Sequence, residues 1–124
     1  MALRAYDPHT FIDWAHSDYP EARCKLRPLT AREVTEVQGD NLALGMLETA
    51  RRGIFACTGV ENPDGTPRVL KLDKTPSGRG IVPDEWLEGL PTEWWAEAAL
   101  EIARMSGIDT ASEEDDEGTE AKNS

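Results

Sequence analysis

The last 16 residues of this chain differ sharply in composition from the rest. Residues 109–124 carry seven acidic side chains against one lysine, a net charge of −6, and contain no large apolar side chain. Such a segment buries too little apolar surface to offset the conformational entropy lost on ordering, so we expect an acidic disordered C-terminal tail. The compact domain must then be built from residues 1–108.

The overall composition is that of a chain that can build one small core. Of the 124 residues, 39% are hydrophobic and 30% are charged, and the formal net charge is −11. This charge disfavours binding to nucleic acid or anionic lipid, because Lys and Arg drive both interactions. No apolar run approaches the roughly 18 residues that span a bilayer, and the N-terminus lacks a secretory signal. We expect no nucleic-acid or membrane partner and a cytoplasmic location.

A strand is predicted over residues 23–29. Its members Cys24, Leu26 and Pro28 alternate with basic residues, which is the period of a half-buried strand. Pro28 has no N–H for a ladder hydrogen bond, so it either ends the strand or lies at a sheet edge. The preceding residues 7–21 combine turn formers with bulky apolar side chains and suit a short helical turn.

Two helices are predicted next. Thr30 and Glu33 have the spacing of a capping box and open a short helix that stops at Gly39. Asp40 or Asn41 caps a second, longer helix. A glycine at position 53 favours an early end to this helix. Its apolar stripe at helical spacing is Ala43, Leu47, Ala50, Ile54 and Cys57.

Two loop segments follow. Residues 61–67 contain a proline–glycine turn, which predicts a small hairpin between residues 54–60 and 68–72. Residues 75–80 contain Gly78-Arg79-Gly80 but lack the Lys-Ser/Thr of a phosphate-binding loop. We expect the second segment to be a flexible connection.

The last helix is the most clearly marked element of the chain. Pro83 opens a short helix, and Pro91 opens a longer one that ends at Gly107. The predicted fold is α+β: a small, α-rich single domain with a minor, edge-like sheet or hairpin. In the last helix we expect four side chains to face inward: Trp95, Ala99, Ile102 and Met105.

The histidines and cysteines form no catalytic or metal-binding pattern. His9 and His16 lack a third strong ligand at a zinc-site spacing, and neither a Gly-x-Ser-x-Gly motif nor a Cys beside a His is present. Cys24 and Cys57 either pair with each other or, as we expect in a reducing cytoplasm, remain two buried thiols. We expect no enzyme activity, no cofactor and no metal.

Aromatic and acidic residues gather at the start of the last helix. Trp94 and Trp95 are about 100° apart on a helix, so they cannot both face the centre of the core. Either both pack in the core or at its boundary, or one is an exposed aromatic anchor at a protein interface, and we expect Trp94 to be the exposed one beside Trp86. Three glutamates at four-residue spacing line one helix face, either as a solvated face relieved by Arg104 or as an acidic docking strip for a basic partner. The predicted partner-binding residues are Trp86, Trp94, Glu93, Glu97 and Glu101.

The basic residues gather in one place. Arg23, Lys25, Arg27 and Arg32 lie within ten positions of one another, without aromatic residues between them that could stack on bases. The cluster either balances the acids of the domain or receives the acidic tail.

Several short motifs occur in order along the chain. They are LRPLTARE at 26–33, GIF at 53–55, GVENPDGTP at 59–67, LPTEWW at 90–95 and IARMSG at 102–107. Together they resemble small proteins encoded among the morphogenesis genes of tailed bacteriophages. Val60 stands where such proteins usually have an aromatic residue.

The resemblance implies a non-enzymatic role in virion morphogenesis. It implies a tail assembly chaperone that keeps a tape-measure or tail-tube protein soluble in the host cytoplasm. Exposed aromatic anchors and an acidic tail suit this task, because the anchors mask apolar surface and the charge opposes self-association. The alternatives are a virion structural component, such as a head–tail joining protein, and an acidic DNA-mimic inhibitor of a host nuclease. The mimic requires acids spread over the folded surface, whereas more than half of the net charge lies in residues 109–124.

Overall fold

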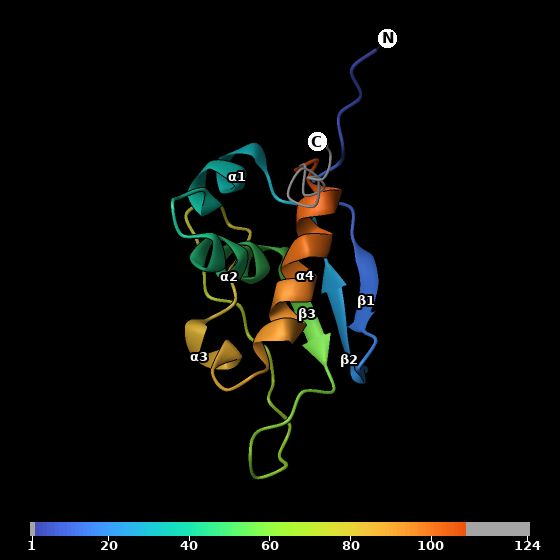
Figure 1. Ribbon diagram of the computed structural model, residues 1–124, viewed down its shortest axis with the longest axis vertical. Helices are drawn as coiled ribbons and strands as arrows, with labels where there is room; N and C mark the ends of the chain where they lie inside the picture. Colours follow the sequence, from blue (N-terminus) through green and yellow to red (C-terminus); the bar gives the residue numbers. More distant parts are fainter. Residues whose placement is uncertain (1, 109–124) are drawn as a thin grey trace, which may run out of the picture.

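The computed structural model describes residues 2–108, which form a three-stranded antiparallel sheet and four helices (Figure 1). This mixed α+β class is as predicted, and the predicted tail, residues 109–124, lies outside the described residues. The strands lie in chain order and are β1 (Ile12–His16), β2 (Tyr19–Leu26) and β3 (Ile54–Thr58). The helices are α1 (Ala31–Val37), α2 (Leu42–Gly53), α3 (Asp84–Leu87) and α4 (Thr92–Met105).

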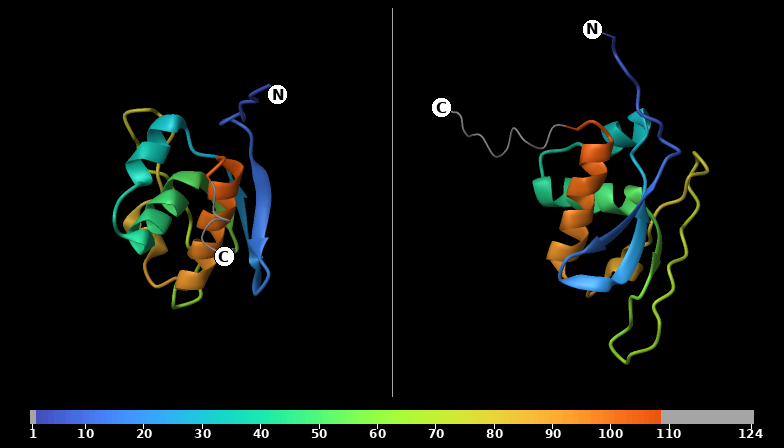
Figure 2. Two further views of the ribbon diagram at one scale, coloured as in Figure 1. Left: turned by 45° about the horizontal axis from the view of Figure 1, so that its top comes forward. Right: turned by 90° about the vertical axis from the view of Figure 1, so that its right-hand side faces the viewer.

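The central strand, β2, follows the predicted alternation. Cys24 and Leu26 are buried in the core, and Lys25 between them lies on the other face of the sheet. The strand ends before Pro28, as predicted. Figure 2 shows α4 lying across the face of the sheet that carries the buried residues.

The predicted helical turn in residues 7–21 is wrong, because residues 12–16 form strand β1. Ile12, Trp14 and His16 are partly buried and alternate with two exposed residues, which is the period of a strand. β1 pairs with β2 along its length, so this pairing outweighs the helical tendency of the segment.

The expectation of two free thiols is also wrong, because Cys24 and Cys57 form a disulfide. They lie directly opposite each other on β2 and β3, with their Cα atoms 4.0 Å apart. Their separation of 33 positions in the sequence gives no sign of this pairing. The pairing depends on the register of β2 against β3, two strands that α1 and α2 separate in the chain.

The helix ends follow local signals. Thr30 and Glu33 form the predicted capping box, and Asn41 caps α2 by accepting a hydrogen bond from a backbone N–H. α2 ends at Gly53, so the predicted stripe does not continue beyond it as helix. A Cβ at Gly53 would overlap the Ile102 side chain, so the close approach of α2 and α4 requires glycine here.

The predicted hairpin around residues 61–67 forms only in part. Glu61 and Pro67 make an isolated bridge, and the Arg68 N–H donates to the Val60 carbonyl at 2.8 Å. Residues 68–72 nevertheless form no strand. β3 pairs instead with β2, the eight-residue central strand of the sheet.

The loop at residues 75–80 is anchored, contrary to the expectation of a flexible connection. The Arg79 guanidinium donates to the Glu33 carboxylate at 3.3 Å and to the carbonyls of Pro28 and Pro8 at 2.8 and 3.1 Å. Glu33 itself is buried. One arginine therefore ties the loop to α1, to the end of β2 and to the N-terminal segment.

Candidate functional site

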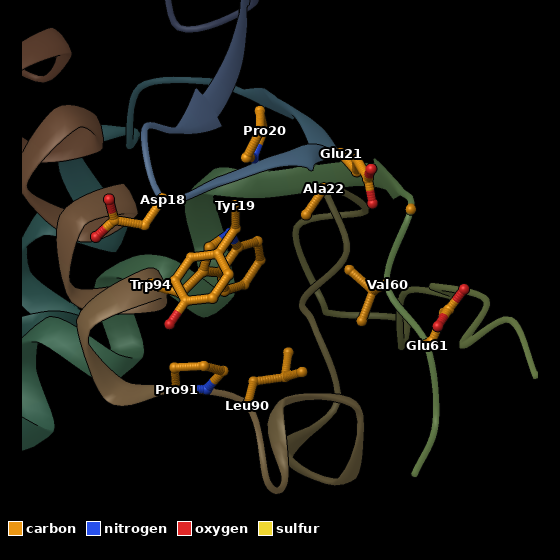
Figure 3. Close-up of a pocket in the computed structure, with 11 residues that line it drawn as sticks. Asp18, Tyr19, Pro20, Glu21, Ala22, Val60, Glu61, Leu90, Pro91 and Trp94 are labelled. Atoms are coloured by element: carbon orange, nitrogen blue, oxygen red, sulfur yellow. The ribbon is translucent and has the colours of Figure 1, made fainter. Parts of the chain in front are cut away.

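A groove of about 430 Å³ lies where α4 begins (Figure 3). The β1–β2 turn, the end of β3 and the connection between α3 and α4 surround it. Its walls are mostly apolar, and carboxylates stand around its rim. The apolar lining consists of Tyr19, Pro20, Ala22, Val60, Leu90, Pro91 and Trp94, and the acidic residues at the rim are Asp18, Glu21 and Glu61.

A fourth carboxylate reaches the groove through a hydrogen bond. The Tyr19 hydroxyl donates to Glu93 Oε2 at 2.9 Å, which links β2 to the first turn of α4. This hydrogen bond and the nearby negative charges of Glu93 and Asp18 raise the pKa of the Tyr19 phenol above its ordinary value. Tyr19 is therefore a neutral donor with an apolar ring at physiological pH.

Trp94 forms part of the wall of this groove, so the prediction that it is exposed is wrong. Its residue exposure is 3%, and its ring centroid lies 5.9 Å from that of Trp14 and 6.1 Å from that of Trp86. Trp86 is buried as well, with its indole N–H donating to the Arg68 carbonyl at 3.2 Å. Neither side chain can serve as a projecting anchor.

The inward face of α4 is rotated by one position at its start. Ala99 and Ile102 are buried as predicted, but Trp94 and Ala98 lie inward in place of Trp95, which is only partly buried. Residues 94, 98 and 102 follow each other at four-residue spacing and share one face. The aromatic partners of Trp94 come from β1 and α3, which the periodicity of α4 alone does not reveal.

The three glutamates of the predicted acidic strip have different surroundings in the structure. Glu93 is exposed and bonded to Tyr19 at the groove, and Glu97 is exposed one turn further along α4. Glu101 forms an ion pair with Arg104, as predicted. Because two helical turns, about 12 Å, separate Glu93 from Glu101, the first belongs to the groove and the last does not.

The carboxylates at the groove have no cationic partner within residues 2–108. Asp18, Glu21, Glu61 and Glu93 form none of the ion pairs of this part of the chain. The groove therefore joins an apolar, aromatic wall to uncompensated negative charge. Such a surface can bind a segment that carries both apolar and basic side chains.

Gly59 shapes the wall of the groove at the end of β3. Its φ of +82° is a conformation that side-chain-bearing residues rarely adopt, and a Cβ there would overlap the backbone of Glu21. This close approach brings Val60 and Glu61 beside β2.

Sequence reasoning missed Tyr19 and Leu90. Tyr19 is the first residue of β2 and Leu90 lies in the connection between α3 and α4; each precedes a proline, and no signal in the chain marks them as neighbours of Trp94. Only the meeting of the β1–β2 turn with the start of α4 brings them together.

Two further properties bear on the kind of site. Within residues 2–108, no three His, Cys, Asp or Glu side chains gather where they could hold a metal ion. In the same part of the chain, none of the helices has the length and apolar content needed to cross a bilayer.

Comparisons with protein-family models, with curated proteins and with solved structures found no match to this chain.

Proposed function

We propose that this chain is a protein-binding module of tailed-phage morphogenesis, a tail assembly chaperone without enzyme activity. Its partner is a tape-measure or tail-tube protein, which it keeps soluble in the host cytoplasm until assembly. The short motifs from residue 26 to residue 107 support the phage context. The groove at the start of α4 supports the binding role.

The observation that carries the proposal is the pairing of an apolar wall with unpaired acids. Leu90, Val60 and the Tyr19 ring offer apolar surface, and Glu21 and Glu61 stand beside it without a cation among residues 2–108. Buried aromatic and apolar contacts supply most of the affinity in protein interfaces, whereas charges at the rim supply orientation and association rate. A basic, partly apolar segment of an assembling protein fits both.

The acidic rim also suits a chaperone that must release its partner. Exposed ion pairs contribute little net free energy, in the range of about 0–1 kcal/mol each. They accelerate encounter without making dissociation slow. A partner held in this way can pass to the growing tail polymer.

Co-expression with the tail-tube or tape-measure protein of the same phage tests the proposal. We expect the soluble fraction of that partner to rise with the wild-type chain and to fall clearly with Glu21→Lys/Glu61→Lys. Asp40→Lys/Asp73→Lys is the matched control, because both residues are exposed and lie away from the groove lining. Equal solubility of the partner with and without the wild-type chain would contradict the chaperone role.

Mass spectrometry of purified virions separates a chaperone from a structural subunit. A chaperone is absent from the finished particle or present only in traces. Recovery at the copy number of a tail or head–tail joining protein would replace the chaperone role by a structural one.

A further inference from the structure

The second charged surface of the molecule is a row of cations along β2. Arg23 and Lys25 alternate with the buried residues of this strand, and Arg27 continues the row just beyond its end. Alternate residues of a strand project from one face and are about 6.7 Å apart. This row lies on the face of the sheet opposite to α4 and is distinct from the groove at the start of that helix.

Two aromatic rings contact the cations at positions 25 and 27 of the row. Phe11 and Phe55 meet edge to face with their centroids 5.6 Å apart. Lys25 Nζ lies 4.8 Å from the Phe11 centroid, and the Arg27 guanidinium carbon lies 5.3 Å from the Phe55 centroid. These cation–π contacts position the charges without neutralising them.

The row has less negative charge around it than positive charge within it. Glu21 precedes Arg23 at the same alternate spacing on β2. The one ion pair of the row within residues 2–108 joins Lys25 to Asp13 at 2.8 Å, with side chains that are 45% and 82% exposed. Arg27 donates only to backbone carbonyls, those of residues 52, 79 and 80. Burial and the nearby charge of Arg79 lower the pKa of Arg27, against the opposite effect of Glu33. The side chain of Arg23 is exposed and forms no hydrogen bond or ion pair with residues 2–108.

The chain itself carries a segment of the complementary charge. Residues 109–124 have a net charge of −6, with an unbroken acidic run at 113–117. In an extended segment, Glu113, Asp115 and Glu117 would face one side at the same spacing as alternate residues of β2. Three carboxylates then match three cations.

The described part of the chain ends near the Arg27 end of the row. The Leu29 N–H donates to Ser106 Oγ at 2.8 Å, so the end of α4 is attached two residues beyond Arg27. Glu113 is five residues and Glu117 nine residues past Ile108, which allows reaches of roughly 17 and 30 Å in extended chain. The acidic run can therefore lie along β2 from Arg27 toward Arg23.

We propose that the acidic segment 113–117 docks within its own molecule on the β2 basic row, leaving the groove free for a basic partner. An attached segment acts at a local concentration in the millimolar range, so weak contacts suffice. A net charge of −11 disfavours an external polyanion as the occupant. Docking of this kind is screened by salt and masks the basic row from acidic surfaces.

Amide NMR spectra of two full-length chains test this docking. One is the wild type, and the other carries Gln or Asn at the five acidic positions 113–117. At low salt we expect differences centred on residues 23–27 and 55–58, reduced by at least about half in 0.5 M salt. In a background of Arg23→Gln/Lys25→Gln the differences should vanish. In the matched background Lys71→Gln/Lys74→Gln, which removes two exposed lysines elsewhere, they should persist.

Four results would overturn the docking. The differences could be absent, or they could centre on a surface other than the basic row. They could grow with protein concentration, which would assign the row to a second copy of the chain. Finally, an oligothymidylate could perturb residues 23–27 of the wild type, which would assign the row to nucleic acid. None of these results concerns the groove, so the docking proposal and the chaperone proposal are tested separately.

Discussion

Carboxylates serve opposite purposes at the junction of α1 with the 75–80 loop and at the groove. At the junction, Glu33 is buried, caps α1 and pairs with Arg79 at 3.2 Å. At the groove, Glu21 and Glu61 are exposed and have no cation within residues 2–108. A buried ion pair that loses one partner leaves an uncompensated charge in a low-dielectric environment, whereas an exposed carboxylate remains solvated. Charge therefore holds the fold together in the first region and is available to a partner in the second.

Packing beneath the groove should show the largest effect on stability. Trp94 is 3% exposed and touches two other tryptophans, so Trp94→Ala should lower the free energy of unfolding by about 3–5 kcal/mol. Trp95→Ala, at a partly buried position, should lose clearly less. Urea denaturation followed by circular dichroism measures both. A larger loss at Trp95 would reverse the assigned orientation of α4.

Removing the Arg79–Glu33 pair at the junction of α1 with the 75–80 loop should have the second-largest effect on stability. Arg79→Met removes the cation from Glu33 and three anchoring hydrogen bonds, and we expect a loss of about 3 kcal/mol. Arg32→Met is the control, since Arg32 is exposed and its side chain forms no bond with residues 2–108, and it should change stability by no more than about 0.5 kcal/mol. Equal stability of the two variants would mean that the junction pair does not hold the fold together.

Acid titration extends the comparison to a second internal carboxylate, Glu48. Burial raises the pKa of Glu48, but hydrogen bonds from Arg52 and Arg51 outweigh it, so the net pKa is lowered. The stability that Glu48 contributes is thus present above the unfolded-state value near 4.5 and is lost as pH falls through the lower folded-state pKa. Glu48→Gln should flatten the fall in stability below pH 4.5. An identical acid profile for wild type and Glu48→Gln would contradict this.

The smallest effect concerns Tyr19 at the groove. Its pKa is raised by the hydrogen bond to Glu93, so the folded protein should ionise this phenol at higher pH than free tyrosine. The stability that the bond supplies is present below pH 10 and is lost as pH rises through the folded-state pKa. Absorbance at alkaline pH, with Tyr19→Phe to assign the transition, should show a smaller shift in Glu93→Gln, because the hydrogen bond to Glu93 is its largest cause. An undiminished shift in Glu93→Gln would mean that other groups cause it.

Local sequence signals predicted the ends of the helices. They did not predict the features that depend on pairing between distant segments. The capping box at Thr30, the Asn41 cap and the stop at Gly107, whose φ is +76°, all depend on a few neighbouring residues. Strand β1 and the Cys24–Cys57 disulfide depend on contacts across the sheet. No pattern confined to one segment carries that information.

Only some of the residues predicted for partner binding lie at the groove. Glu93 and the tryptophans near the start of α4 do lie at the groove or just beneath it. The direction of Trp94 could not be read from α4, because its aromatic neighbours come from β1 and α3. The apolar wall uses Tyr19 and Leu90, which are adjacent only after the β1–β2 turn meets α4.

The association rate of the chain with its tail partner, measured at two salt concentrations, tests the central claim most directly. With the tail-tube or tape-measure protein immobilised, the wild-type rate should fall steeply between low and high salt, because the rim carboxylates steer the encounter. Glu61→Lys should bind more slowly and lose part of that salt dependence, while Asp40→Lys should behave like the wild type. Identical rates and identical salt dependence for Glu61→Lys and Asp40→Lys would show that the groove is not the binding site.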